Sequence, residues 1–297
     1  MGKASRIKQQ SAREKIAAQR EAARKAERRN RIMITAGSTL VVLVIVAAFI
    51  VIKLSQGSPS NSSAGGRTLL PASVSSQITG VPAATLNSVG KGAVPVFTRG
   101  QPAFTAGTGA PLTSGGKPQM LYIGAEFCPY CAATRWSMAV ALSRFGTLTP
   151  LHGIHSSSTD ADPNTATLTF YKSGYNSKYL NFTPVEVQKV DRSALQNPTS
   201  AQNAIWAKYE PDANSRGYPF IAFSNKAVMK GPIWDAAVLQ GKSWSQIAAA
   251  LQDPTSPIAK SVLGGANYIT GAICKMTNNQ PSDVCSSPAV QAVQSGL

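Results

Sequence analysis

The sequence contains few of the residues that usually hold metal ions. Its 297 residues include only four cysteines and two histidines, with a single Cys-x-x-Cys pair, Cys128 and Cys131. Without a second such pair, a zinc centre needs His152 and His155 as further ligands. We expect both histidines in one strand, where residues three apart point to opposite faces and cannot bind one ion together. A metal site is therefore disfavoured.

Acidic residues are also scarce, and the basic residues are unevenly placed. The chain has 13 Asp and Glu against 29 Lys and Arg, which gives a formal net charge of +16. Eleven of the basic residues lie within residues 1–31, together with only three acids. Each basic residue near anionic lipid contributes about 1 kcal/mol of attraction. We interpret this arm as a segment that contacts anionic lipid, in preference to the alternative of nucleic-acid binding.

A long hydrophobic run occurs once, at Ile32–Ile52. This uncharged stretch of 21 residues would span about 31 Å as a helix, the thickness of the hydrocarbon core of a bilayer. A buried core helix is an alternative, but an all-round apolar stretch preceded by arginines favours a membrane crossing. A cleaved signal peptide usually has a shorter apolar region, of about 7 to 15 residues. We expect an uncleaved, single-pass anchor in the cell membrane, with a cytoplasmic N-terminus and an extracytoplasmic C-terminal domain.

Composition then divides the chain into four parts, and no internal repeat is visible. Residues 55–67 are almost entirely Ser, Gly, Asn and Pro, a composition typical of a tether. The predicted parts are a basic cytoplasmic arm (1–31), a transmembrane helix (32–52), a flexible linker (53–68) and an extracytoplasmic domain (69–297).

Hydrophobic patterning predicts a mixed α/β domain. Gln119–Phe127 is an apolar run of strand length, and the residues from Pro129 to Arg144 favour a helix. A hairpin is expected where two apolar runs flank Ser-Asn-Lys. The other expected elements are strands at 93–98, 148–156, 219–223 and 227–230, and helices at 82–89, 203–209, 243–251 and 257–274. Strands that alternate with helices, followed by a terminal hairpin and helix, indicate an α/β sandwich.

The order strand, cysteine, proline, helix places Cys128 and Cys131 in a setting suited to thiol–disulfide exchange. Exchange needs an accessible thiolate and a second thiol that resolves the mixed disulfide. At the start of a helix, free N–H groups and the positive end of the dipole stabilise a Cys128 thiolate and lower its pKa. Pro129 suits the first turn, where its missing N–H is no loss. Cys131 lies one turn deeper on the same side, as the resolving thiol. A permanent structural bridge is the alternative, although so short a loop removes little chain entropy.

The stretch GAEFCPYC followed by a helix resembles the thioredoxin superfamily, and Arg216-Gly217-Tyr218-Pro219 before PFIAF resembles that family's cis-proline loop. The resemblance implies that Pro219 is cis and lies beside the two cysteines, and that Tyr218 helps to dock the substrate backbone. Judged from the residues alone, Pro219 could also open a strand in the trans form.

Several residues depart from the thioredoxin pattern. Pro129 and Tyr130 replace Gly-Pro between the cysteines, as in glutaredoxins, and the resemblance implies that they contact substrate. Thioredoxins carry a buried carboxylate where this chain has Tyr122, while Glu126 is expected to face solvent. The long separation between Cys128 and the proline loop leaves room for an insertion across Thr159–Asp212.

The anchor, GAEFCPYCAATRW, the TLTFY of Thr167–Tyr171 and the late ICKMTNNQPSDVC together resemble an uncharacterised bacterial and archaeal family of thioredoxin-like proteins, domain-of-unknown-function family nine-two-nine. The similarity covers most of residues 69–285 and implies a fold but no established substrate. The expected fold class is α/β, a thioredoxin-like sandwich with an insertion between the Cys-x-x-Cys helix and the cis-proline strand, preceded by one transmembrane helix.

The remaining two cysteines, Cys274 and Cys285, enclose ten residues rich in turn formers. In an oxidising compartment they most simply form a structural disulfide, with an electron relay to Cys131 or to a membrane partner as the alternative. Four cysteines permit three pairings, so a crossed pairing stays open at this point. Among single residues, Arg135 has a claim to function only if it points toward Cys128, where a cation favours the thiolate. Trp136 is expected in the core.

Taken together, the sequence predicts a membrane-anchored, extracytoplasmic protein thiol–disulfide oxidoreductase in which Cys128 exchanges and Cys131 resolves. The oxidising compartment and the proline between the cysteines favour an oxidase or isomerase over a reductase. The expected partners are protein thiols or disulfides and a membrane redox protein, with no cofactor. The alternative is a non-catalytic binding module that keeps a permanent Cys128–Cys131 bridge.

Overall fold

A computed structural model describes residues 66–94, 97–98, 101–102, 104–294 and 296–297. The predicted arm and anchor, and the linker up to residue 65, lie outside the described residues. Within the described part of the chain, no helix is both long enough and apolar enough to cross a membrane. The described residues belong to one compact unit, called the folded unit below.

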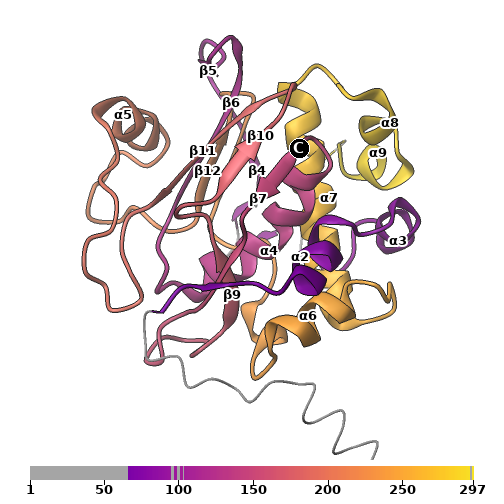
Figure 1. The fold of residues 1–297 in the computed structure, drawn as a ribbon. Coiled ribbons are helices and arrows are strands. Elements are labelled where there is room, and N and C mark those ends of the chain that lie inside the picture. Colours follow the sequence, from indigo (N-terminus) through magenta and orange to yellow (C-terminus); the bar gives the residue numbers. More distant parts are fainter. Residues whose placement is uncertain (1–65, 95–96, 99–100, 103, 295) are drawn as a thin grey trace, which may run out of the picture. The chain divides into compact units, whose positions relative to one another are not determined.

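The described residues form a mixed α/β structure (Figure 1). The strands are β1 (Thr68–Leu69), β2 (Phe97–Thr98), β3 (Gln101–Pro102), β4 (Phe104–Ala106), β5 (Thr113–Ser114), β6 (Lys117–Gly124), β7 (Thr147–Thr149), β8 (His152–His155), β9 (Ala166–Thr169), β10 (Gly174–Asn176), β11 (Asn181–Glu186), β12 (Phe220–Phe223) and β13 (Ala227–Lys230). The helices are α2 (Ala72–Thr79), α3 (Ala83–Val89), α4 (Pro129–Ser143), α5 (Ser200–Tyr209), η1 (Ala236–Leu239), α6 (Trp244–Ala250), α7 (Pro257–Met276), α8 (Ser282–Cys285) and α9 (Pro288–Gln294).

The central sheet has the strand order β11-β6-β12-β13-β4, with β5 paired to the start of β6. β11 runs parallel to β6, and the pairs β6–β12, β12–β13 and β13–β4 are antiparallel. β6 is therefore an inner strand, and its residues from Met120 to Ile123 are fully buried. This explains why β6 reads as a continuous apolar run, since both of its faces are covered.

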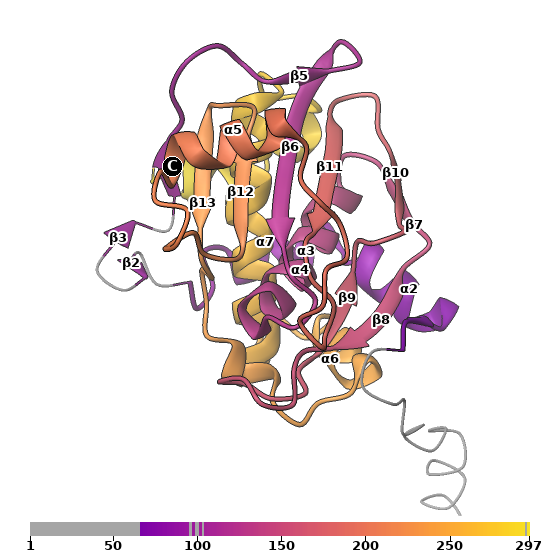
Figure 2. The same cartoon turned by 90° about the vertical axis from the view of Figure 1, so that its left-hand side faces the viewer.

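Helices cover both faces of this sheet. Met120, Tyr122, Ile221 and Phe223 point to the side of α4 and α7, where the larger hydrophobic core lies. The alternate residues of the same strands pack with Trp206 of α5 in a smaller core on the other side. Figure 2 shows α5 in front of the sheet and α7 behind it. The sheet is thus the middle layer of three.

The long helix α7 packs along α4. Ser137 of α4 donates a hydrogen bond to the backbone oxygen of Val262 at 2.8 Å and accepts one from the indole of Trp234 at 3.0 Å. Gly265 lies at this crossing, where an added Cβ would be 2.6 Å from the Ser137 hydroxyl oxygen. A glycine here lets the helices approach closely, which fixes α4 against the core.

The predicted elements compare closely with the structure around α4 and after residue 200. The expected hairpin is β12–β13, and the three expected helices after residue 200 correspond to α5, α6 and α7. The expected strand 148–156 is divided into β7 and β8, and Pro150, which has no N–H to donate to a strand ladder, lies between them. The region of the predicted insertion, Thr159–Asp212, is also divided: it supplies β11 and α5 to the central layers, whereas β9 joins β8 and β1 in a separate sheet.

Candidate functional site

The two cysteines of the Cys-x-x-Cys pair lie where β6 passes into α4. Cys128 is the N-cap residue of α4 and has an extended backbone, and Pro129 occupies the first helical position. The Cys128 sulfur accepts a hydrogen bond from the backbone N–H of Cys131, with an N···S distance of 3.3 Å. A thiolate at this position is stabilised by free N–H groups of the first helical turn and by the helix dipole.

The pKa values of the two cysteines are shifted in opposite directions. Cys128 is 5% exposed and Cys131 is 0% exposed. The interaction with the Cys131 thiol lowers the pKa of Cys128 and outweighs the opposing effect of burial, with further help from the Cys131 N–H and from Arg135. Burial raises the pKa of Cys131, and the neighbouring Cys128 raises it further. Cys128 is thus the better nucleophile, and Cys131 is held behind it.

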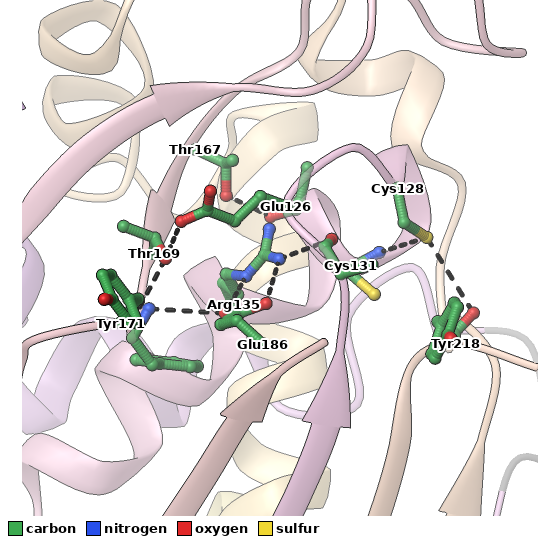
Figure 3. Close-up of polar contacts among 12 residues, drawn as sticks. Glu126, Cys128, Cys131, Arg135, Thr167, Thr169, Tyr171, Glu186 and Tyr218 are labelled. Atoms are coloured by element: carbon green, nitrogen blue, oxygen red, sulfur yellow. Dashed lines mark hydrogen bonds and ion pairs between the residues drawn. The ribbon is translucent and has the colours of Figure 1, made fainter. Parts of the chain in front are cut away.

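A cis peptide bond links Tyr218 to Pro219 opposite the cysteines, as the resemblance implied. β12 begins at the next residue and pairs with β6, with Phe220 opposite Ile123, so the loop lies beside the end of β6. The Cys128 sulfur is 4.0 Å from the Tyr218 backbone oxygen (Figure 3). The structure thus brings Cys128, Cys131, Tyr218 and Pro219 together.

Aromatic side chains surround this position. The Tyr218 ring meets Phe127 edge-on, with ring centroids 6.3 Å apart, and lies 5.6 Å from the Trp206 ring. Arg192 covers Phe127, with its guanidinium carbon 3.9 Å from the ring centroid. Tyr130, half-buried between the cysteines, packs against the same small cluster. Pro129, by contrast, is buried in the first turn of the helix.

A buried ion pair lies beneath the cysteines. Arg135 of α4 and Glu186 at the end of β11 are both 0% exposed and are joined by two hydrogen bonds, of 2.8 Å from Nε and 2.7 Å from Nη2. Nη2 also donates to the backbone oxygen of Ala125 at 2.7 Å. Burial opposes the charge on Arg135, but Glu186, Tyr122 and Cys131 outweigh it and raise the pKa of the guanidinium. Arg135 is therefore a permanent cation next to Cys131.

Glu126 does not face solvent, so that expectation was wrong. Its side chain is 1% exposed because Arg67 holds both carboxylate oxygens, at 2.9 and 2.8 Å, and the Thr169 hydroxyl donates to one of them at 2.7 Å. Arg67 in turn stacks over the Tyr171 ring at 4.5 Å. Arg67, which precedes the predicted domain boundary, thus contacts the segment that carries Cys128. Thr68, which also precedes that boundary, pairs with Gly153 of β8.

Tyr122, on the inner strand β6, places its hydroxyl in the protein interior near Arg135 and Cys131. Its oxygen is buried and has no hydrogen-bond partner among the described residues. Burial raises the pKa of the phenol well above its ordinary value, and the charge of Arg135 opposes this effect while Cys131 adds to it. Gly124 leaves room for the phenol, since a side chain at Gly124 would collide with the Tyr122 hydroxyl.

One comparison with known proteins identifies a family. The model of the family described as "Domain of unknown function (DUF929)" matches residues 104–275. The chain belongs to this family. No curated protein and no solved structure matches the chain. The DUF929 match contains both cysteines of the pair, the cis-proline loop, Arg135 and Glu186, whereas Arg67 and Cys285 lie outside it.

The second cysteine pair of this DUF929 protein is a disulfide. Cys274 and Cys285 are bonded, with Cα atoms 5.6 Å apart, and both side chains are buried in the larger core. The bond joins the end of α7 to α8. Arg144, at the end of α4, contacts Thr270 and Ser287, so this disulfide lies near the end of α4 opposite to Cys128. Since a helix of 15 residues is about 22 Å long, this separation and the burial favour the structural role over a relay.

The two histidines lie on one short strand. His152 and His155 both lie in β8, and the His155 ring packs against Trp244 at a tilt of 47°, with ring centroids 4.6 Å apart. Burial lowers the pKa of His155. In the described part of the DUF929 chain, no three His, Cys, Asp or Glu side chains are grouped so that they could hold a metal ion.

Sequence reasoning missed Glu186 and Arg67. Glu186 is the one charged residue of β11, and Arg135 is the one charged residue of α4. Isolated charges within buried segments are normally paired, and that is the signal that could have linked them. Arg67 lies at the end of a Gly- and Ser-rich stretch that looks like a tether, so its role had no local signal.

Proposed function

We propose that this protein is a membrane-anchored, extracytoplasmic protein thiol–disulfide oxidoreductase with a thioredoxin-like fold, which acts as an oxidase or isomerase. Cys128 exchanges disulfides with protein substrates and Cys131 resolves the mixed disulfide. The observation that carries this proposal is the placement of Cys128 as the N-cap of α4, with a lowered pKa, facing the cis Tyr218–Pro219 bond, and with Cys131 buried behind it.

The thioredoxin-like fold is supported by the arrangement of the central layers. The Cys-x-x-Cys pair follows the inner strand β6, a parallel strand β11 lies on one side of it, and the cis proline opens β12 of the hairpin on the other. α4 and α7 cover one face of the sheet and α5 the other. The second sheet β1-β8-β9 and the pair β7–β10 are additions to this arrangement.

The reaction proceeds by two exchanges. In the oxidising direction a substrate thiolate attacks the Cys128 sulfur of the Cys128–Cys131 disulfide, the bond between the two enzyme sulfurs breaks, and Cys131 leaves as a thiolate. A second substrate thiolate then attacks the substrate sulfur of the mixed disulfide and releases Cys128 as a thiolate. The substrate dithiol is oxidised to a disulfide, and the enzyme disulfide is reduced to two thiols. A membrane redox partner re-oxidises the pair.

The preferred direction of electron flow follows from the lowered pKa of Cys128. The lowered pKa of Cys128 stabilises its thiolate and therefore the reduced enzyme. A dithiol whose reduced form is stabilised is a stronger oxidant, because its disulfide accepts electrons more readily. This favours the oxidase or isomerase role over electron donation.

The proposal also covers the location of the protein in the membrane and the residues that bind its substrates. Ile32–Ile52 anchors the protein in the membrane, the basic arm contacts anionic lipid on the cytoplasmic side, and the folded unit lies on the other side. Tyr218 binds the substrate backbone beside Cys128, and the half-buried Tyr130 contacts substrate at the helix start, where the buried Pro129 supports the first turn beneath it. Phe127 and Trp206 back the Tyr218 ring.

The test is the reduction potential of the Cys128–Cys131 pair. The full-length chain in mild detergent is equilibrated with glutathione buffers, and free thiols are counted by mass spectrometry, with Cys274 and Cys285 remaining bonded. We expect a potential of about −120 to −180 mV. A value below about −300 mV would mean a permanent bridge and would favour the non-catalytic binding module instead.

A trapping experiment gives an independent readout. Cys131→Ser should accumulate mixed disulfides with extracytoplasmic proteins, because the resolving thiol is missing, while Cys128→Ser should form none. Cys274→Ser with Cys285→Ser serves as the control for loss of other cysteines. Equal trapping by the Cys128→Ser and Cys131→Ser variants would contradict the assigned roles.

A further inference from the structure

The Cys131 thiolate is the least stable species of the proposed reaction, because Cys131 has no exposed surface. It is released whenever a substrate attacks Cys128, and the same species is the attacking group when the step runs in reverse. Transfer of an anion from water to a protein interior is costly unless an opposite charge or hydrogen-bond donors compensate it. The interior beneath Cys131 therefore needs a cation or a donor.

Arg135 is in the position to meet this need. It lies four residues after Cys131 on α4, so both side chains share one face of the helix, and helical side chains lean toward the N-terminus. The bond from Nη2 to the Ala125 oxygen fixes the guanidinium under the segment that leads into Cys128. Figure 3 shows the guanidinium beside Cys131, with Glu186 on its other side.

Stability alone gives a weak reason for this ion pair. Replacement of a buried ion pair by apolar residues of similar size is often neutral or stabilising, because the pair must be desolvated. One nitrogen of Arg135, Nη1, is also buried without a partner among the described residues, which adds to the cost. A charged group kept at such a cost next to the reacting sulfurs points to a functional role.

We propose that Arg135 is the positioning residue that stabilises the buried Cys131 thiolate, and that Glu186 holds the guanidinium in place and moderates its charge. This inference rests on the proposed exchange reaction. In the step concerned, the Cys128–Cys131 bond breaks, a bond between Cys128 and the substrate sulfur forms, and the electron pair of the broken bond goes to Cys131 beside the guanidinium. The reverse step returns this pair to the Cys128 sulfur and expels the substrate thiolate.

The charged and titratable groups near Cys131 lead to opposite predictions for the pKa of its thiol, depending on which charge is removed. Cys131 interacts with five such groups. These are Arg135 and Cys128 on the same helix, Glu186 on β11, and the phenols of Tyr122 on β6 and of Tyr218 before β12. Arg135 lowers the pKa of Cys131, and Glu186 raises it by a smaller amount. Removal of the carboxylate alone should therefore favour the thiolate, whereas removal of both charges should disfavour it.

The measurement isolates the attack of Cys131. The reduced full-length chain in detergent is mixed with 5,5′-dithiobis(2-nitrobenzoate); Cys128 releases one nitrothiobenzoate and retains another, which Cys131 then displaces in a second phase. The rate of that phase is recorded against pH. Cys131→Ser should lack the second phase, which assigns it to Cys131.

The variants have distinct expected outcomes. Arg135→Met combined with Glu186→Gln should displace the rate profile to higher pH by about 1 to 3 units. At fixed neutral pH this slows the second phase by about 3- to 40-fold, since nucleophilicity rises with pKa and offsets part of the loss. Glu186→Gln alone should displace the profile to lower pH, and Arg135→Lys should stay near the wild type. Arg144→Met, at the far end of α4, should leave the profile unchanged.

The results separate failure of this inference from failure of the proposed function. A wild-type chain with no second phase at any pH would overturn the exchange reaction itself. A normal wild type with unshifted profiles in the variants would overturn the role of Arg135 alone, as would equal slowing by Glu186→Gln and by the double variant. If the double variant does not fold, the direction of the Glu186→Gln displacement decides the question.

Discussion

Replacement of Arg67 by methionine should destabilise the folded unit, because it leaves Glu126 as a buried carboxylate without its cation. Glu126 is 1% exposed and Arg67 is 24% exposed, and two hydrogen bonds join them. Breaking a fully buried pair costs about 3–5 kcal/mol, and an exposed pair contributes at most about 1 kcal/mol. For this part-buried pair we expect a loss of about 2–3 kcal/mol in the free energy of unfolding.

The double variant Arg67→Met with Glu126→Gln tests the cause. Glutamine has no charge, and its amide oxygen still accepts the hydrogen bond that the Thr169 hydroxyl now donates to Glu126. Most of the lost stability should therefore return, leaving a deficit of about 1 kcal/mol. Arg192→Met is the matched control, since Arg192 also stacks on an aromatic ring and pairs with an acid, Asp160, but its side chain is 50% exposed.

The assay is urea unfolding of the full-length chain in mild detergent, followed by tryptophan fluorescence. The reasoning fails if Arg67→Met costs no more than Arg192→Met, because the ion pair would then behave as an exposed one. It also fails if the double variant is as unstable as the single variant. In that case packing of Arg67 on Tyr171 would account for the loss instead of the charge.

Two further predictions concern the cysteines. Iodoacetamide should alkylate Cys128 of the reduced protein before Cys131, and it should do so at pH values below those at which an ordinary thiol reacts. The reason is that the thiolate of Cys128 persists as the pH falls until its lowered pKa is reached. Preferential labelling of Cys131 in a peptide map would contradict this prediction. Removal of the C-terminal disulfide by Cys274→Ala with Cys285→Ala should lower the free energy of unfolding by about 2–3 kcal/mol. The reduction potential of the Cys128–Cys131 pair should stay unchanged, whereas a changed potential would support the relay alternative.

The sequence was sufficient to predict those elements whose structure depends on a short-range residue pattern. The strand before Cys128, the helix after it and the β12–β13 hairpin each have a short-range signal: an apolar run, an N-cap followed by proline, or a turn between two apolar runs. The disulfide between Cys274 and Cys285 was also expected and is present. Local pattern also placed Cys128 at the helix start, where the structure has it.

The parts that were not predicted depend on contacts between distant segments. Arg135 and Glu186 are 51 residues apart in sequence, and Arg67 and Glu126 are 59 apart. Whether a charge is buried and paired depends on which strands become neighbours, and β11 was not recognised as the parallel partner of β6. For the same reason Glu126 was expected in solvent, since its partner lay in a stretch that looked like linker.

The contact between Arg67 and Glu126 also holds the first described residues of the chain near Cys128. Glu126 is two residues before Cys128, so the chain enters the unit close to the reactive sulfur. If the proposed anchor ends at Ile52, only residues 53–66 separate it from Arg67, and 14 residues extend to at most about 50 Å. Under this proposal the linker length sets an upper limit on the distance between Arg67 and the membrane. Substrates held at the membrane, such as nascent secreted chains and other membrane proteins, would then meet Cys128 at a raised local concentration.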